Sequence, residues 1–145
     1  MNRYENLRTL FYQEIENHCH GIYKQKAYFH SLQVCSLTQK LALEKHLDIE
    51  IAGIIGLFHD YAQFINHSSF DHANRSSQMM IPLLKDFSEE EKNIIINAIK
   101  NHSDKERIDD VYSEILKDAD VLAQYFMKPK QIFKPASKKR LDLYI

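Results

Sequence analysis

The dipeptide His59-Asp60 offers the clearest chemistry in this sequence, because it ends an apolar segment, 54–58, that is typical of a buried helix. Burying an imidazole and a carboxylate is costly unless they are hydrogen-bonded, ion-paired or bound to a metal. Imidazole nitrogens and carboxylate oxygens are also ligands that divalent ions take in proteins. The dipeptide therefore indicates either a satisfied polar core or a metal site.

Three more polar residues stand at positions that are expected to face the interior. His30, His102 and Asp120 each fall on the apolar face of a separate predicted helix. A single inward histidine is most often a hydrogen-bonded core residue, so none of them identifies a metal site alone. With His59 they predict four helices that present polar groups to one interior, where a divalent ion would stabilise them. The residues alone leave a metal site and a hydrogen-bonded polar core both open.

Helices are the elements expected to carry these residues. The chain contains only 3 glycines and 3 prolines, which disfavours a turn-rich β fold and favours long helices with short connections. Asp48 is a suitable N-cap, Ser88 and Glu91 match a capping box, and 63–70 is typical of a loop. The predicted fold class is all-α, with helices over about 3–18, 24–46, 48–60, 71–85, 88–101 and 110–126 and a short helix near the C-terminus.

Length and composition favour one compact domain with a single core over residues 1–145. The net charge of -1 gives no general attraction to nucleic acid or to a membrane. Cys19 and Cys35 show no repeated spacing and are expected to be reduced residues that serve packing. No apolar run approaches the roughly 18–20 residues of a membrane span, and the first residues lack the pattern of a secretory signal. We therefore expect a cytoplasmic protein.

Two segments give the sequence a resemblance to a known family. Residues 57–62 read LFHDYA, residues 116–122 read LKDADVL, and a histidine, His30, precedes both. In this order the motifs resemble the HD-domain superfamily of metal-dependent phosphohydrolases. The resemblance covers a core of about 22–126, and residues 127–145 form a basic C-terminal extension of it. It implies a helical bundle of about six to seven helices.

The resemblance also implies a set of metal ligands. The first histidine, the HD pair and the last aspartate of the family bind one metal, and they correspond here to His30, His59, Asp60 and Asp120. A subset of the family has two further histidines that hold a second metal.

His72 and His102 occupy the places of these two histidines in this sequence. The HD aspartate then bridges the two ions, and Asp60 is its counterpart. The implied cofactor is one or two divalent ions, chosen from Mn, Fe, Co, Ni, Zn and Mg.

The implied reaction is hydrolysis of a phosphate ester or anhydride in a nucleotide or another small phosphorylated molecule. The ions lower the pKa of a water that attacks phosphorus, and nearby cations neutralise charge on the phosphate oxygens. Lys26 lies one helical turn before His30, and Arg75 lies one turn after His72, so both are candidates to contact phosphate. With Asp60 and Asp71, they form the set of candidate catalytic residues.

One departure from the family prevents a narrower prediction. Some pyrophosphate-cleaving relatives carry an acidic residue just after the HD pair, whereas residues 61–64 here read YAQF. Asp71 or Asp118 could substitute, although Asp71 is also a plausible N-cap. Two alternatives stay open, a diiron oxygenase on the same scaffold and a non-catalytic helical module that binds metal.

The basic C-terminal extension offers no clear chemistry. Its cations between Lys128 and Arg140 are expected to form a solvated tail. Apolar residues follow, among them Leu141 and Tyr144, and are expected to dock on the core or on the second subunit of a homodimer. The expected ligand of the whole protein is a small phosphorylated substrate, without membrane or nucleic-acid partners.

Overall fold

The computed structural model describes residues 2–145, and these contain helices and no strand. The prediction of an all-α fold is therefore confirmed. The helices are α1 (Arg3–His18), α2 (Gly21–Glu44), α3 (Ile49–Phe58), α4 (Tyr61–Asn66), α5 (His72–Met80), α6 (Glu89–Asn101), α7 (Val111–Met127) and α8 (Pro135–Leu141), with a short 3-10 turn, η1 (Ile81–Leu83), after α5.

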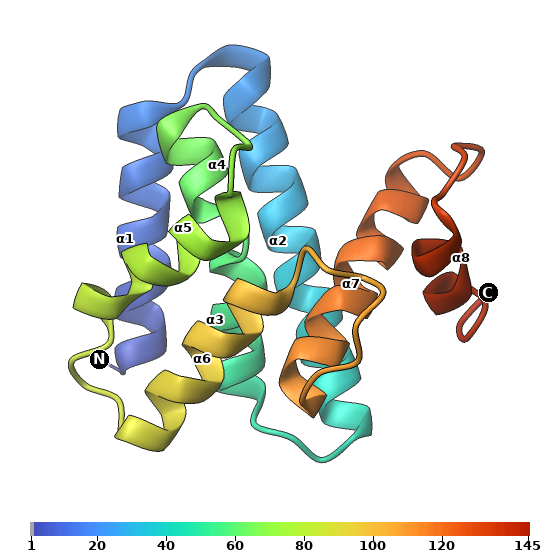
Figure 1. The fold of residues 1–145 in the computed structure, drawn as a ribbon. Coiled ribbons are helices and arrows are strands. Elements are labelled where there is room, and N and C mark those ends of the chain that lie inside the picture. The colour runs from blue at the N-terminus through green and yellow to red at the C-terminus, as the bar shows by residue number, and fades with distance from the viewer. Residues whose placement is uncertain (1) are drawn as a thin grey trace.

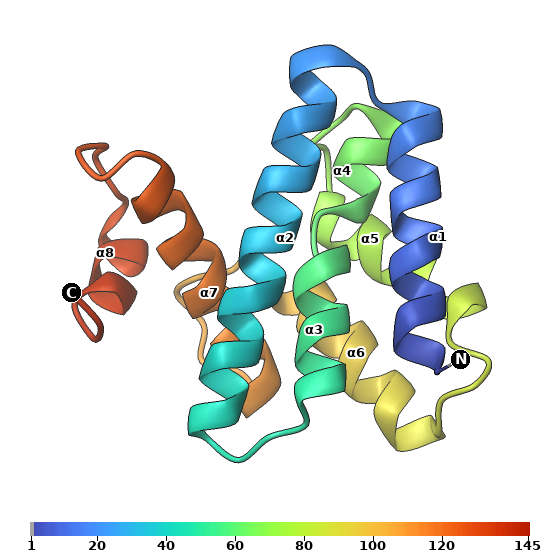
Figure 2. The same cartoon turned by 180° about the vertical axis from the view of Figure 1, so that it is seen from behind.

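The longest helix, α2, organises the bundle. It packs chiefly against α3 on one side and α7 on another, while α5 and α6 pack against each other. Figures 1 and 2 show α1 and α8 on opposite sides of the molecule, with α2, α3 and α7 between them. Because α3 lies among α1, α2, α6 and α7, the residue at its C-terminal end can reach side chains from several helices.

The short helix α3 forms the centre of the core. All of its residues from Ile51 to Phe58 are buried, and Phe11 of α1 packs edge-on against Phe58. This full burial explains why the segment before His59 is apolar on every face rather than on one stripe. Within residues 2–145, every helix is too short or too polar to cross a membrane.

Local sequence signals account for most helix ends. Asp48 caps α3 by accepting hydrogen bonds from the Glu50 and Ile51 amides, and Ser88 and Glu91 form the expected capping box of α6. The predicted helix over 71–85 instead ends at Met80 and continues only as η1, because Pro82 cannot continue the α-helical hydrogen bonding.

The loop predicted for residues 63–70 is wrong in its first part. Residues 61–66 form α4, in which Tyr61 and Phe64 are buried and pack edge-on against Phe58 and Tyr23. Tertiary packing of these aromatic rings therefore overrides a weak local preference. The helix ends at His67, which adopts the left-handed conformation with φ 52°.

The solvated tail expected near the C-terminus is wrong for Arg140. This residue lies in α8 with only 7% of its surface exposed, because two acidic residues of α7 bind its guanidinium. Leu141 is also buried and joins the hydrophobic core, as expected for an end that docks on the protein. The other basic residues of α8, Lys138 and Lys139, are exposed.

A glycine sets the distance between α2 and α3. A Cβ atom added at Gly56 would lie 2.7 Å from the Cα of Cys35 and 2.9 Å from the carbonyl oxygen of Val34. Both atoms belong to the backbone of α2, so they cannot rotate away. The close approach of the two backbones brings the end of α3 next to His30.

We predict that Gly56→Ala lowers the free energy of unfolding by about 1–3 kcal/mol, the usual cost of overpacking. Gly53→Ala is the matched control on the same helix, because its Cβ would meet the side-chain ends of Gln39 and Tyr4, which can move. Urea denaturation of the two variants tests this difference. An equal loss of stability in both would show that the α2–α3 distance is not limiting.

Candidate metal centre

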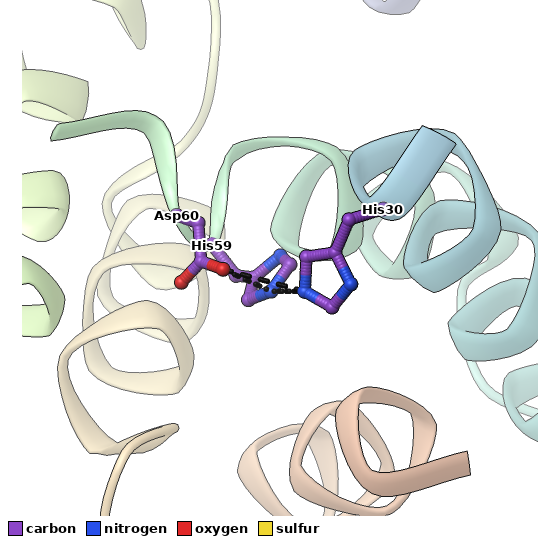
Figure 3. Close-up of side chains that lie close together, drawn as sticks. All are labelled: His30, His59 and Asp60. Carbon is purple, nitrogen blue, oxygen red and sulfur yellow. Dashed lines mark hydrogen bonds and ion pairs between the residues drawn. The ribbon is translucent and has the colours of Figure 1, made fainter. Parts of the chain in front are cut away.

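Six polar side chains from five parts of the chain meet at the inner end of α3. The structure thus brings together every residue that was predicted as a metal ligand, and Figure 3 shows three of them, His30, His59 and Asp60. They are His30 of α2, His59 and Asp60 between α3 and α4, His72 at the start of α5, His102 at the end of α6, and Asp120 of α7.

The carboxylate of Asp60 divides its two oxygens between two pairs of histidines. Its Oδ2 lies 3.1 Å from Nε2 of His59 and 3.3 Å from Nε2 of His30. Its Oδ1 lies 3.1 Å from Nε2 of His102 and 3.2 Å from Nε2 of His72. Asp60 therefore stands between two adjacent groups of nitrogens.

The carboxylate of Asp120 completes only the first of these groups. Its Oδ1 lies 3.1 Å from Nε2 of His30 and 3.5 Å from Nε2 of His59. This buried oxygen makes no hydrogen bond to any of residues 2–145, because the short contacts lack hydrogen-bond geometry. The other oxygen, Oδ2, accepts a hydrogen bond of 2.9 Å from Nζ of Lys105.

Backbone carbonyls decide which nitrogen of each ring carries hydrogen. Nδ1 lies 2.7 Å from the Gly56 oxygen in His59, 2.7 Å from the Ile99 oxygen in His102 and 3.1 Å from the Ser69 oxygen in His72. A carbonyl oxygen can only accept, so Nδ1 donates in each case. In the neutral ring, Nε2 then carries a lone pair, which points toward the carboxylates.

The centre therefore places acceptors against acceptors. Nε2 of His59, His72 and His102, the three rings whose Nδ1 donates to a carbonyl, lie 3.1 to 3.2 Å from carboxylate oxygens of Asp60. Lone pairs at this separation repel unless a cation lies between them, either a proton or a metal ion. The orphaned oxygen of Asp120 indicates that protons do not satisfy the whole group, so the residues fit a divalent ion.

Burial and the neighbouring carboxylates shift the pKa values of the histidines in different directions. Burial disfavours the charged ring of His59, but the carboxylates of Asp60 and Asp120 outweigh it and raise its pKa to about 10. The pKa values of both carboxyl groups lie well below the usual range, since the neighbouring cations outweigh their burial. The pKa of His102 is instead lowered, because burial prevails over its contact with Asp60.

Two ligand sets follow from these contacts. One consists of His30, His59, Oδ2 of Asp60 and Oδ1 of Asp120, and the other of His72, His102 and Oδ1 of Asp60. Nitrogen and carboxylate ligands of this kind suit the divalent ions from Mn to Zn. Asp60, for which the resemblance implies a bridging role, thus lies between two groups of side chains that could each hold an ion.

A pocket of about 860 Å³ opens above this centre. Five of the six polar residues line its floor, and His59 lies behind them without exposed surface. The walls hold two cations, four amides and several apolar side chains. The cations are Lys26 and Lys105; the amides are Gln25, Gln63, Gln124 and Gln131; the apolar group includes Ile22, Phe29, Phe64 and Met127.

The candidate catalytic residues outside the ligand set fall into two groups. Lys26 is exposed and lines the pocket, as expected for a phosphate contact. Asp71 lies outside that pocket, where it accepts a hydrogen bond from Asn74, and Arg75 is exposed and does not line the pocket. The geometry therefore supports Lys26 and gives no support to Asp71 or Arg75.

Sequence reasoning missed Lys105. It lies in the connection between α6 and α7, where its Nζ donates to the His102 carbonyl at 2.6 Å and to Asp120 at 2.9 Å. A lysine in a polar loop carries no signal that distinguishes it from solvated lysines. Only the fold shows that it stands beside the ligands and in the pocket wall.

A second acidic group, at the other end of α3, has a different explanation. Asp48, Glu50 and Glu91 lie close enough to hold a cation. The guanidinium of Arg3 binds Glu50 at 2.8 Å and Glu91 at 2.5 Å, and the carboxylate of Asp48 caps α3, so each of the three acids already has a partner. We assign it to the packing of α1 on α3 and α6.

Known proteins resemble this chain over most of its length. The chain is 32% identical over 101 residues to ribonuclease Y of two strains of Staphylococcus epidermidis, a match that covers 70% of this chain but only 18% of those relatives. No solved structure matches the chain significantly. The model of the HD domain family matches residues 27–125, which include all six polar residues. The chain therefore belongs to the HD domain family.

Proposed function

We propose that this protein is a metal-dependent phosphohydrolase that cleaves a phosphate ester or anhydride of a small molecule. The observation that carries the proposal is the division of the Asp60 carboxylate between two pairs of imidazole nitrogens in the lining of an open pocket. Divalent ions bound there would lower the pKa of water and withdraw charge from phosphate.

The chain's own residues support phosphate as the reacting group. Lys26 and Lys105 are the cations in the pocket lining, and both lie on its walls rather than among the ligands. Phosphate oxygens gain charge during transfer, so cations at this place stabilise the transition state. We assign both lysines to phosphate binding, and Lys105 additionally holds Oδ2 of Asp120 so that Oδ1 stays directed at the ligand group.

The rest of the lining supports a small substrate with a largely uncharged body. Four glutamine amides can hydrogen-bond neutral polar groups, and the exposed ring of Phe29 offers a face for stacking. A nucleotide combines these features. A long RNA would instead require a track of cations along its backbone, whereas the lining holds two lysines.

The ribonuclease relatives support hydrolysis at phosphorus, since their name denotes cleavage of phosphodiester bonds in RNA. The shared segment is a small part of those proteins, so it supports the chemistry of the centre more than their substrate. A diiron oxygenase on the same ligands is the alternative chemistry, and the lysines beside the pocket floor favour phosphate hydrolysis over it.

The proposal is tested on protein that is stripped with a chelator and reloaded separately with Mn²⁺, Mg²⁺, Zn²⁺, Co²⁺, Ni²⁺ or, anaerobically, Fe²⁺. Substrates are nucleoside mono-, di- and triphosphates, bis(p-nitrophenyl) phosphate and a short oligoribonucleotide. We expect hydrolysis of a small phosphate with a redox-inactive metal and no uptake of oxygen. Oxygen consumption that occurs only with iron would establish the diiron oxygenase. Preference for the oligoribonucleotide would overturn the proposal that the substrate is a small molecule.

We predict that Asp60→Asn removes metal from both ligand sets and lowers hydrolysis at least about 100-fold, because one change deletes charge from two sites. Metal content is measured by elemental analysis and folding by circular dichroism. Asp86→Asn, which changes an exposed carboxylate outside the pocket lining, is the control and keeps both properties. If Asp60→Asn lost only thermal stability, the centre would be structural.

We predict that metal binding releases protons and tightens as the pH rises. His59, with its pKa raised to about 10, holds a proton at neutral pH that a metal ion must displace. Calorimetry in buffers with different ionisation enthalpies counts the released protons. Equal heats in all buffers would contradict the protonated state of the metal-free centre.

The same pKa shift predicts the stability of the metal-free protein. Since the folded-state pKa of His59 lies above its ordinary value of 6.5, its ion pairs stabilise the fold fully below pH 6.5 and are lost as the pH rises toward 10. The melting temperature of chelator-treated protein should therefore fall over this range. Metal-loaded protein should lose less, because the ion replaces the protons.

A further inference from the structure

The loop between α6 and α7 is held in place by side chains from outside it. This loop, residues 102–110, contributes Lys105 to the pocket wall. Two buried cations bind its backbone, and they come from different helices. One is Lys117 of α7, with no exposed surface, and the other is Arg140 of α8.

The guanidinium of Arg140 spreads its hydrogen bonds over two parts of the protein. Its Nη1 donates to Asp118 at 2.9 Å and to Glu114 at 3.0 Å, both on α7. Its Nε donates to the carbonyl oxygen of Lys105 at 3.0 Å, and Nη2 makes a longer contact of 3.4 Å to the carbonyl of Arg107. Arg140 thus ties the loop to α7 through its planar fork of donors.

The groups around Arg140 match its guanidinium in charge and in geometry. The second oxygen of Asp118 accepts a hydrogen bond of 2.6 Å from the hydroxyl of Tyr144, so the carboxylate stays oriented toward Arg140. Asp118 lies two residues before Asp120 on α7. An ammonium could bind some of these groups, whereas the planar fork of a guanidinium reaches both acids and both loop carbonyls at once.

Lys117 holds the other half of the loop. Its Nζ donates to the carbonyl of Arg107 and to Oδ2 of Asp109, both at 2.7 Å. The backbone of Lys105 then depends on Arg140, and its side chain extends to Asp120 and the His102 carbonyl. Arg140 of α8 is therefore connected to Asp120 of the candidate metal centre through the loop residue Lys105.

We propose that Arg140 is a positioning residue for the pocket, which fixes the loop 102–110 so that Lys105 stands beside Asp120 and faces the bound phosphate. The role of Lys105 in phosphate binding comes from the function proposed above, so this proposal rests on that function. It gives the C-terminal helix α8, which lies beyond the region 27–125 matched by the family, a part in substrate binding.

The test uses four single variants of the full chain and one double variant. Arg140→Gln removes the charge and most donors of the fork, and Arg140→Lys keeps the charge but cannot bind the acids and both carbonyls together. Lys105→Met removes the pocket cation. Lys138→Gln is the matched control, since Lys138 is a cation of the same helix that pairs with Asp142 at the surface. The double variant combines Arg140→Gln with Lys105→Met.

Hydrogen exchange of the amides of residues 103–110 gives the first readout, which depends on neither metal nor activity. We expect faster exchange in Arg140→Gln, an intermediate rate in Arg140→Lys and an unchanged rate in Lys138→Gln. Arg140→Lys keeps the test decisive if Arg140→Gln does not fold. Unchanged protection of the loop in a folded Arg140 variant would overturn the proposal.

The affinity of Mn²⁺-loaded protein for inorganic phosphate, measured by calorimetry, gives the second readout. We expect Arg140→Gln and Lys105→Met each to weaken binding about tenfold, and the double variant to be no weaker than Lys105→Met. Additive losses would show that Arg140 does not act through Lys105. If the unchanged protein bound no phosphate, the proposed function would fail while loop protection still decided the role of Arg140.

Discussion

The constraint on which the rest of this structure depends is the close approach of buried hydrogen-bond acceptors around Asp60. Nε2 of His59 lies 3.1 Å from one oxygen of Asp60, and Nε2 of His102 lies 3.1 Å from the other. Carbonyls bound to Nδ1 orient both rings, so the rings cannot turn to relieve the contact. Such an arrangement requires cations, and it persists because the surrounding helices hold it.

The supporting helices meet this requirement with tight packing on one side and buried ion pairs on the other. On the α2–α3 side, Gly56 lets two backbones approach and also supplies the carbonyl that orients His59. On the α7–α8 side, Lys117 and Arg140 lie buried among acids and loop carbonyls. A buried ion pair contributes little net stability, but removal of one partner is costly because it leaves an unpaired buried charge.

The region matched by the HD domain family contains the centre, whereas part of the pocket wall lies outside that region. The family's region, residues 27–125, contains the six polar residues and Lys105. Part of the wall comes from elsewhere, since Ile22 and Gln131 lie outside that region and Arg140 acts from α8.

The sequence by itself determined the helical class, the caps at Asp48 and Ser88, and five of the six polar residues at the centre, because periodicity and side-chain chemistry are local properties. The sixth, His72, followed only from the resemblance to the HD family. It misjudged α4 and the surroundings of Arg140, where burial by distant helices overrides local preference. Only the tertiary structure decided that Asp60 faces two histidine pairs and that Lys105 belongs to the pocket, since these contacts join residues far apart in the chain.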